Sequence, residues 1–292
     1  MIPKIIHYCW FGGNPKPDDV KRYLASWKNC CPDYEIREWN ESNFDVNEND
    51  YCRDAYAAKK WAFVADYARV KVLHEYGGIY LDTDVEVIKS FDDLLHYGAF
   101  LCFESDSAVS IGTFGAEKGN DLLQDLLDAY KQMEFQWKSG HTVTNLMILT
   151  NILVKKYHLK CNGKQQILDS NIAVFPMEAF IAKDANTGWI MSGEMTYAIH
   201  HYAASWYDEE SKRIAESNAY YLRKYWCIVK KPLLKLASCH TAYDQGGLSK
   251  FMEKLILYIK RAFVNWGGTN KENCFRSCHN QLIIPYYMGV AV

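Results

Sequence analysis

The chain has 292 residues, of which 49% are hydrophobic and 23% are charged. This composition is that of a globular protein, and it excludes a disordered chain, a collagen-like repeat and a disulfide-rich mini-scaffold. The net charge of −2 gives no reason to expect a nucleic-acid-binding protein. At this length we expect one large α/β domain, or a domain of about 200 residues with an appendage.

The near-neutral net charge hides an asymmetry along the chain. Residues 220–292 contain 11 Lys and Arg against 3 Asp and Glu, a balance of +8, whereas residues 1–219 carry −10. A basic segment attached to an acidic body suggests that the segment meets an anionic partner. We therefore divide the chain into a body, residues 1–219, and a basic, mainly helical C-terminal region, residues 220–292.

The body alternates between expected strands and expected helices. Strands are expected at residues 5–11, 34–39, 79–87, 99–103 and 172–175, and helices at 18–27, 54–76, 120–133 and 142–157. The long helix 54–76 ends at Gly77-Gly78, because glycine accommodates the left-handed residue that closes a helix. This alternation predicts an α/β fold.

The C-terminal region contains one amphipathic pattern, at residues 250–264, with aromatic and aliphatic residues on one face and Lys or Arg elsewhere. Such a helix either lies in the interface of an anionic membrane or packs on the body with a solvated basic face. No secretory signal and no apolar run of 18 residues is found, so we expect a cytoplasmic protein, peripheral at the inner face of the cell membrane. The ten cysteines are expected as free thiols, because Cys274, Cys278 and His279 lack a second ligand pair for zinc.

Asp82-Thr83-Asp84 is the most informative tripeptide. On the expected strand 79–87, the side chains of Asp82 and Asp84 would project to the same side, so that their carboxylates converge. Two such carboxylates repel each other unless a cation lies beside them, and their hard oxygen atoms suit Mg²⁺ or Mn²⁺. Such an ion in turn binds a diphosphate. The alternative is a polar strand end that faces water.

Asp66 and Arg69 lie three residues apart on the preceding helix and therefore share one of its faces. The simplest interpretation is an intrahelical ion pair, which stabilises a protein by only about a few tenths of a kcal/mol. The tight Gly77-Gly78 turn, however, brings the end of this helix back beside the acidic strand. A carboxylate and a guanidinium group there are suited to bind sugar hydroxyl groups or to neutralise charge.

Three motifs in order resemble one known family. Asp66-x-x-Arg69 followed by residues 77–84 (GGIYLDTD) resembles the core motif of glycosyltransferase family 32, the DxD sugar-binding-region glycosyltransferases. Residues 2–13 (IPKIIHYCWFGG) resemble the family's first strand, and residues 200–206 (HHYAASW) resemble its C-terminal signature. The family includes capsular-polysaccharide enzymes and yeast α-1,6-mannosyltransferases, and large clostridial glucosylating toxins are distant relatives.

The resemblance implies a GT-A fold, a nucleotide-sugar donor, a divalent metal ion and retention of the anomeric configuration. Carried over by position, Asp66 and Arg69 would contact the donor sugar. Asp82 would lie near the ribose and the metal ion, and Asp84 would bind the metal ion directly. These four residues are the catalytic candidates that the resemblance implies.

The resemblance also implies residues for the nucleotide. Trp10 would stack on the base, although its alternative is a core tryptophan beside a glycine turn. Tyr80 would contact the nucleotide or its ribose, and Ser205 and Trp206 would approach the diphosphate. Gly140 belongs to a loop that departs from the family pattern.

That loop reads Ser139-Gly140-His141-Thr142, where family members often carry Thr-Gly-Pro, so Gly140, His141 and Thr142 are weaker candidates for sugar contacts. One of His200 and His201 would complete the metal shell, as a late histidine does in several GT-A enzymes. Imidazole binds Mn²⁺ well, so the expected cofactor is Mn²⁺ or Mg²⁺. Both histidines stay candidates, because neighbours on a strand face opposite sides, and a structural role is the alternative for each.

The implied reaction moves a hexose from a UDP- or GDP-sugar to a glycan or a lipid-linked oligosaccharide, in capsular or other surface polysaccharide synthesis. The partners are thus the donor, the acceptor and an anionic membrane surface, with no nucleic acid. Glu104 and Asp106 follow an expected strand, either near the donor or in a polar loop, and we assign neither to the site. The alternatives from other classes are a noncatalytic sugar-binding protein and a nucleotide-sugar phosphohydrolase.

Overall fold

The computed structural model describes residues 1–136, 145–185, 187–203, 213–220, 242–244, 246–254 and 256. The chain divides into two compact units, Met1–Lys183 with Ile190–Trp206, and Asp184–Trp189 with Tyr207–Val292. The division into residues 1–219 and 220–292 stays a prediction.

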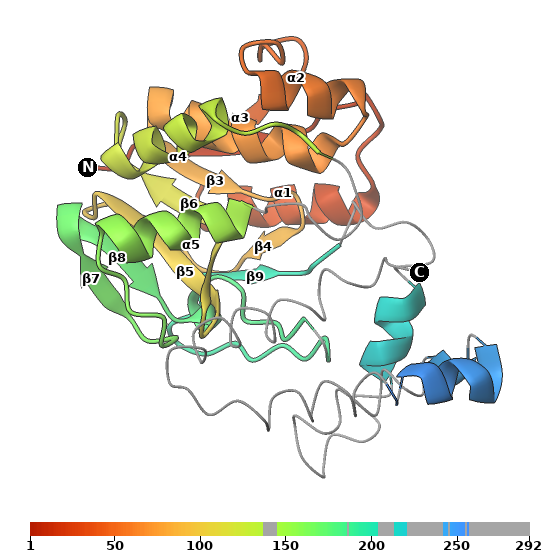
Figure 1. Cartoon of the computed structure of the whole chain (residues 1–292). Coiled ribbons are helices and arrows are strands. Elements are labelled where there is room, and N and C mark those ends of the chain that lie inside the picture. Colours follow the sequence, from red (N-terminus) through yellow and green to blue (C-terminus); the bar gives the residue numbers. More distant parts are fainter. Residues whose placement is uncertain are drawn as a thin grey trace. The chain divides into compact units, whose positions relative to one another are not determined.

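The first unit contains all the elements labelled in Figure 1. Its helices of at least two turns are α1 (Asp18–Cys30), α2 (Asp50–Ala57), α3 (Trp61–Tyr76), α4 (Asp121–Lys131) and α5 (Asn145–Lys156). Its strands are β1 (Ile5–Cys9), β2 (Glu35–Trp39), β3 (Gly78–Leu81), β4 (Val85–Val87), β5 (Ala99–Ser105), β6 (Ala108–Ala116), β7 (Gln166–Leu168), β8 (Ile172–Phe175) and β9 (Ala198–His200).

In the described part of the chain, seven strands form one mixed sheet in the order β2-β1-β3-β6-β5-β8-β7, and β4 pairs with β9 in a small second sheet. Strand β1 is parallel to both β2 and β3, whereas β6 is antiparallel to β3 and β5. Strand β2 therefore lies on one side of β1 and strand β3 on the other, so the direction of the strand order reverses at β1. In open α/β sheets, ligands bind at such a switch point, beyond the carboxyl ends of the strands.

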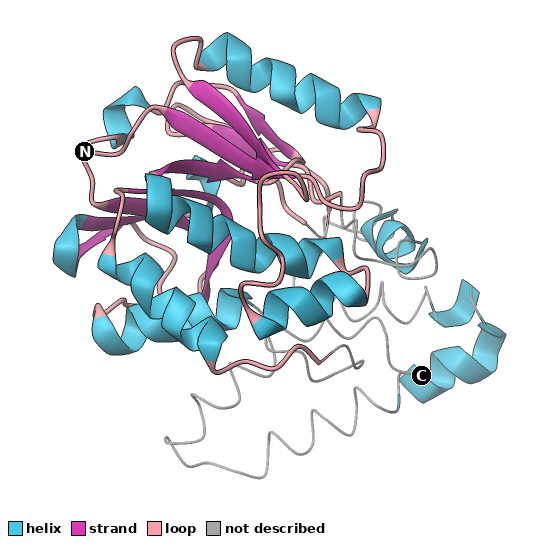
Figure 2. Cartoon of the chain, turned by 90° about the horizontal axis from the view of Figure 1, so that it is seen from above, coloured by secondary structure: helices cyan, strands magenta, loops and turns pink. Residues whose placement is uncertain are grey.

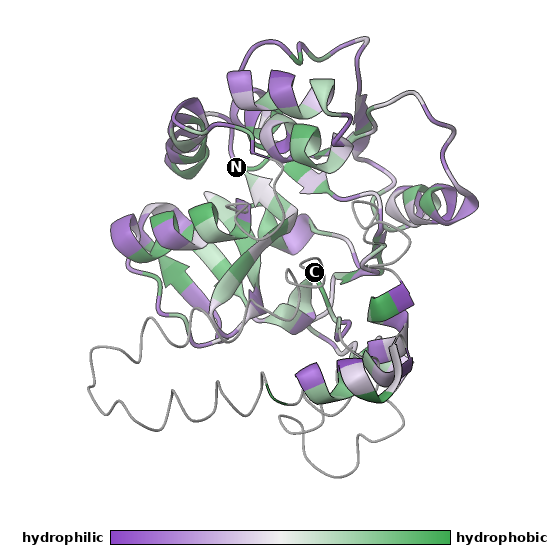
Figure 3. Cartoon of the chain, turned by 45° about the vertical axis from the view of Figure 1, so that its right-hand side comes forward, coloured by the Kyte–Doolittle hydropathy of each residue, from purple (hydrophilic) through white to green (hydrophobic). Residues whose placement is uncertain are grey.

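Helices cover both faces of the main sheet (Figure 2). One face packs on α2, α3, α4 and α5 in a hydrophobic cluster that includes Val64, Leu73 and Leu126. The other face packs on α1, whose Trp27 is fully buried beside Ile6 and Ile79. The strands are accordingly mostly hydrophobic, and the helices combine hydrophobic and hydrophilic residues (Figure 3). The predicted α/β class is confirmed.

The single helix expected at 54–76 is wrong, because two helices, α2 and α3, meet at residues 58–60. Lys59 adopts a left-handed conformation with φ of 56°. The N–H of Lys60 donates to the carbonyl of Ala55, and that of Lys59 to the carbonyl of Tyr56, which is the hydrogen-bond pattern of a Schellman C-cap. A lysine fills the position that glycine usually takes, so the sequence carries no stop signal there.

The single strand expected at 79–87 is also wrong. The chain turns at residues 82–84, where the N–H of Val85 donates to the carbonyl of Asp82, and β3 and β4 then belong to different sheets. Strands β6, β7 and β9 were not predicted from the sequence. Strand β6 is buried along its whole length and contains two Ala and two Gly, which are depleted in strands.

In the second unit, residues 213–220 and 246–254 are helical, and the rest of the amphipathic pattern at 250–264 lies largely outside the described residues. Among the described helices, none combines the length and the hydropathy that a membrane-spanning segment requires. Six cysteines in the described part of the chain are free thiols, namely Cys9, Cys30, Cys31, Cys52, Cys102 and Cys161. Cys274, Cys278 and His279 lie outside the described residues.

Candidate active site at the ends of β1 and β3

The acidic tripeptide lies at the switch point of the sheet, directly after β3. Asp82 and Asp84 converge, but through the turn at 82–84 rather than through the pleat of a strand. Each offers a carboxylate oxygen, and His200 offers a ring nitrogen, within 4.8 Å of one another. The convergence expected from the sequence is present, although the backbone geometry behind it differs.

The antiparallel pairing of β4 with β9 brings His200 to this turn, because Val85 is the register partner of His200. Nε2 of His200 lies 3.1 Å from Oδ1 of Asp84. His201 points elsewhere: its Nε2 lies 2.8 Å from Oε2 of Glu86, and its ring stacks on Tyr23. Of the two histidines, the structure places only His200 with the two aspartates.

The three groups are electrostatically linked. Burial disfavours the charged form of each, but the charge of His200 and the N–H of Ala203 lower the pKa of Asp84 to about 2. Asp84 in turn, against the same burial, raises the pKa of His200 to about 9. Burial raises the pKa of Asp82, whereas Arg69 opposes that change. Asp84 and His200 thus each favour the charged form of the other.

The chemistry of these donors fits such a cation. Two carboxylate oxygens and one imidazole nitrogen are ligands that suit Mn²⁺, and the two carboxylates also suit Mg²⁺. In the described part of the chain, the second ring nitrogen of His200, Nδ1, is buried and has no hydrogen-bond partner. Since a buried polar atom normally has a partner, this atom is consistent with a site built for a further ligand.

Arg69 connects α3 to the acidic turn. Its Nη2 lies 3.1 Å from Oδ1 of Asp66 and 3.1 Å from Oδ1 of Asp82, and its Nη1 donates to Oδ2 of Asp82 at 3.3 Å. The intrahelical ion pair with Asp66 is therefore present, and Arg69 also makes a bidentate contact with the carboxylate of Asp82. Nη1 also donates to the carbonyl of Ile111 on β6 at 3.2 Å, which fixes the guanidinium group.

Tyr80 supports this guanidinium group. Its side chain is 1% exposed, and the centre of its ring lies 4.6 Å from Cζ of Arg69. Tyr80 thus makes a cation–π contact with Arg69, and its contact with the nucleotide stays a prediction.

Trp10 lies beyond the carboxyl end of β1 and is partly buried. Its Nε1 donates to the carbonyl of Asn14 at 2.7 Å, and Nζ of Lys16 lies 5.7 Å from the centre of its ring. Trp10 lines a hollow of about 470 Å³ and is therefore not only a core residue. Ser205 and Trp206, like Gly140, His141 and Thr142, lie outside the described residues.

Three residues at the site escaped the sequence analysis or were left unassigned by it. Asn145, the first residue of α5, donates from Nδ2 to Oδ1 of Asp66 at 2.6 Å. Glu104 is partly buried; burial raises its pKa, and the charge of His200 and a hydrogen bond from Ser110 lower it. Gly112 on β6 faces Asp82 and His200. For Asn145 and Gly112 the sequence carries no signal, because only the fold brings them to the acids.

Comparison with known proteins supports the resemblance seen in the sequence. The model of the glycosyltransferase sugar-binding region containing the DXD motif matches residues 17–101. Inositol phosphoceramide mannosyltransferase 3 of Schizosaccharomyces pombe is 31% identical over 144 residues, which cover 47% of this chain and 39% of that protein. Mannosyl phosphorylinositol ceramide synthase SUR1 of Saccharomyces cerevisiae is 28% identical over 203 residues, 65% of this chain and 52% of that protein.

The family model over residues 17–101 and the two curated relatives support the resemblance to glycosyltransferase family 32. Its mixed α/β sheet, with the Asp-x-Asp turn directly after β3, is the GT-A architecture that the resemblance implied. The chain spans about half, or less, of the length of the two curated relatives. Among solved structures, the PaToxG glycosyltransferase is 20% identical with a TM-score of 0.43, covering 53% of this chain and 70% of that one.

Proposed function

We propose that this chain is a metal-dependent glycosyltransferase that moves a hexose from a nucleoside-diphosphate sugar to a hydroxyl group of a glycan or lipid-linked acceptor. The observation that carries the proposal is the convergence of Asp82, Asp84 and His200 at the switch point, with Arg69 held beside them. A noncatalytic relative would have no need to keep these charged groups together in a partly buried position.

Asp82, Asp84 and His200 would hold the cation, Mn²⁺ or Mg²⁺, which when bound supplies positive charge to the departing diphosphate. Arg69 keeps Asp82 oriented, because it contacts both oxygens of that carboxylate. Asp66 is oriented in the same way by Arg69 and Asn145, so that it presents a fixed carboxylate to the hydroxyl groups of the donor sugar.

The proposed transfer retains the anomeric configuration. The bond between the sugar carbon and the diphosphate oxygen breaks, the acceptor oxygen bonds to that carbon on the same face, and the acceptor proton passes to the departing phosphate. This route needs no dedicated general base, and three of the described carboxylates of the site, those of Asp66, Asp82 and Asp84, are each engaged by Arg69, His200 or Asn145.

The names of the two curated relatives support mannose as the sugar and an inositol-containing ceramide lipid as the acceptor. We extend both to this chain as part of the proposal. The role in capsular polysaccharide synthesis expected from the sequence stays a prediction, and so does the location at the inner face of the cell membrane.

A panel of UDP- and GDP-sugars, incubated with the protein and Mn²⁺, tests the proposal through the release of nucleotide. We expect slow release without an acceptor, strong stimulation by an acceptor, and loss of both in Asp84→Ala. Asp128→Ala, an exposed aspartate on α4 that pairs with Lys131, is the matched control and is expected to keep full turnover.

Other outcomes would favour the alternative functions. Fast release that no acceptor stimulates would indicate a phosphohydrolase. A donor that raises the melting temperature but is never cleaved would indicate a noncatalytic sugar-binding protein, and either result would overturn the proposal.

A further inference from the structure

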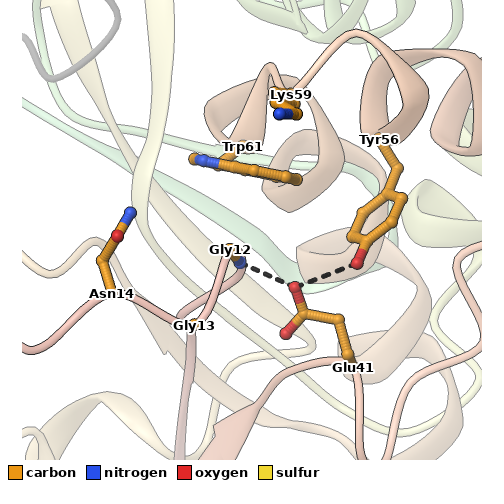
Figure 4. A pocket seen from close by; sticks show the side chains of 7 residues that line it. All are labelled: Gly12, Gly13, Asn14, Glu41, Tyr56, Lys59 and Trp61. Carbon is orange, nitrogen blue, oxygen red and sulfur yellow. Dashed lines mark hydrogen bonds between the residues drawn. The ribbon is translucent and has the colours of Figure 1, made fainter.

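Two neighbouring hollows lie beside the Gly12-Gly13 turn that follows β1. The first, of about 560 Å³, is lined by Trp61 and Tyr56 among others and is drawn in Figure 4. The second, of about 470 Å³, is lined by Trp10. They share Gly13, Asn14 and Glu41, so the carboxylate of Glu41 borders both. Their sizes are typical of sites for small ligands.

The hollows lie within reach of a nucleotide held at the acidic turn. Strands β1 and β3 are parallel with His7 opposite Tyr80, and the same register, continued past the strand ends, brings Trp10 level with Thr83. On the other side, Trp61 begins α3, which carries Asp66 between one and two turns later. A diphosphate at the acidic turn would therefore leave its nucleoside beside the two indole rings, where a base can stack.

The carboxylate of Glu41 is held in a fixed orientation. Its Oε1 accepts a hydrogen bond from the N–H of Gly12 at 2.7 Å and one from the hydroxyl of Tyr56 at 3.3 Å. Among the described residues, Oε2 accepts no hydrogen bond, and in Figure 4 it points away from Tyr56, on the side of Gly13. Since a carboxylate offers about four acceptor positions, Glu41 retains capacity for a ligand.

The second carboxylate at these hollows, that of Glu38, has less free capacity, because three groups already bind it. Glu38 accepts from the hydroxyl of Tyr8 at 2.6 Å and from Nζ of Lys16 at 2.7 Å on Oε2, and from Nδ2 of Asn40 at 3.1 Å on Oε1. Asn40 also accepts from the N–H of Ser42 at 2.9 Å, which stabilises the turn that carries Glu41. Glu41 is thus a preformed acceptor at the place where a base would lie.

We propose that Glu41 selects guanine, so that the donor is a GDP-sugar rather than a UDP-sugar; this inference rests on the proposed function. Guanine presents two adjacent donors on its Watson–Crick edge, N1–H and the N2 amino group, and a carboxylate accepts both. Uracil presents one N–H between two carbonyl oxygens, which a carboxylate repels. A carboxylate that faces a carbonyl oxygen of uracil is left without a donor, and such a mismatch discriminates strongly between two bases.

The test is the equilibrium binding of GDP, IDP and UDP to the full-length protein in Mn²⁺, measured by calorimetry without any sugar. We expect GDP to bind about tenfold to 100-fold more tightly than UDP. The base of IDP lacks the N2 amino group, so IDP should bind at least about fivefold more weakly than GDP. Glu41→Gln should reduce the ratio of GDP to UDP affinity about tenfold. Glu35→Gln, an exposed glutamate at the opposite end of β2, is the matched control and should leave the ratio unchanged.

Three results would overturn the inference. UDP binding as tight as GDP binding would exclude guanine selection while leaving the proposed transferase intact. A preference for GDP that Glu41→Gln leaves unchanged would remove Glu41 as its cause. Failure of every nucleotide to bind would overturn both the inference and the proposed function. The melting temperature of Glu41→Gln, which is expected to match that of the original chain because Glu41 is exposed, shows that the variant is folded.

Discussion

Gly112 borders the candidate metal site, and its lack of a side chain matters there. A Cβ atom at this position on β6 would lie 2.9 Å from Oδ2 of Asp82 and 3.2 Å from Cε1 of His200. Both distances are shorter than ordinary van der Waals contacts of such atoms. Glycine therefore allows the aspartate and the histidine to approach each other across the strand.

We predict that Gly112→Ala weakens the binding of Mn²⁺ about tenfold, because changes that reorient metal ligands typically cost tenfold to 100-fold in affinity. Titration of Mn²⁺ followed by calorimetry measures the effect. Gly193→Ala is the control, since a Cβ at Gly193 meets no atom within 4 Å. Equal affinity in the two variants would show that Gly112 does not determine the geometry of Asp82 and His200.

The individual residues of the site differ in how far the sequence predicts them. Asp82 and Asp84 stand two apart in a recognisable motif, so their convergence was predictable even though the turn was not. The choice between His200 and His201 required the register of β9 against β4, which no local pattern specifies. Asn145 is 79 residues from Asp66 in sequence, and only tertiary structure joins them.

His7 joins three elements at the base of the site. Its Nε2 lies 2.8 Å from the carbonyl of Gly77, between α3 and β3, and its Nδ1 lies 3.0 Å from Nε1 of Trp39 on β2. The indole nitrogen can only donate, so Nδ1 accepts and the proton of neutral His7 is on Nε2. A second proton would leave Nδ1 and Trp39 facing each other as two donors.

This arrangement predicts a loss of stability in mild acid. Burial lowers the pKa of His7 from 6.5 to about 4, so between these values the unfolded state binds the additional proton. The stabilising contribution is complete above pH 6.5 and is lost as the pH falls toward 4. Because its pKa shifts from 6.5 to about 4, His7 alone should lower the free energy of unfolding by about 3 kcal/mol across this window.

Urea unfolding at a series of pH values measures this loss. His7→Gln, which cannot titrate, should lower stability at pH 7 but flatten its pH dependence between 4 and 6.5. His96→Gln, at an exposed position before β5, should keep the steep dependence of the original chain. A dependence as steep in His7→Gln as in the original chain would assign the acid sensitivity to other groups.

The elements show why prediction from sequence was partial. Strands β1, β2, β5 and β8 were predicted because they contain aromatic or β-branched residues, which in β2 alternate with charged ones. The break between α2 and α3 was missed because Lys59 adopts a conformation that residue identity does not favour. Strand β6 was missed because burial on both faces, not intrinsic propensity, makes its small residues extended.

Charge is distributed unevenly along the chain, with −10 on residues 1–219 and +8 on residues 220–292. The acidic part includes the carboxylates at the switch point, but most of its charge lies on the surface. The division between the two compact units, after Trp206, falls close to the change of charge. Composition alone locates this change, whereas the partner of the basic region has to be found by experiment.

We predict that the basic region binds anionic membranes, because a Lys or Arg near such a surface contributes about 1 kcal/mol and the acidic body is repelled from it. Residues 245–292 contain six Lys and Arg against two Asp and Glu, so their deletion should reduce co-sedimentation with phosphatidylserine vesicles. Binding by the full chain should also fall as salt is raised and be weak on neutral vesicles. Lys260→Glu with Arg261→Glu, in the full chain, should weaken binding without any truncation, while turnover with a soluble acceptor stays measurable. If vesicle binding is the same in the deletion and in the double variant as in the original chain, the basic residues serve another partner or only solubility.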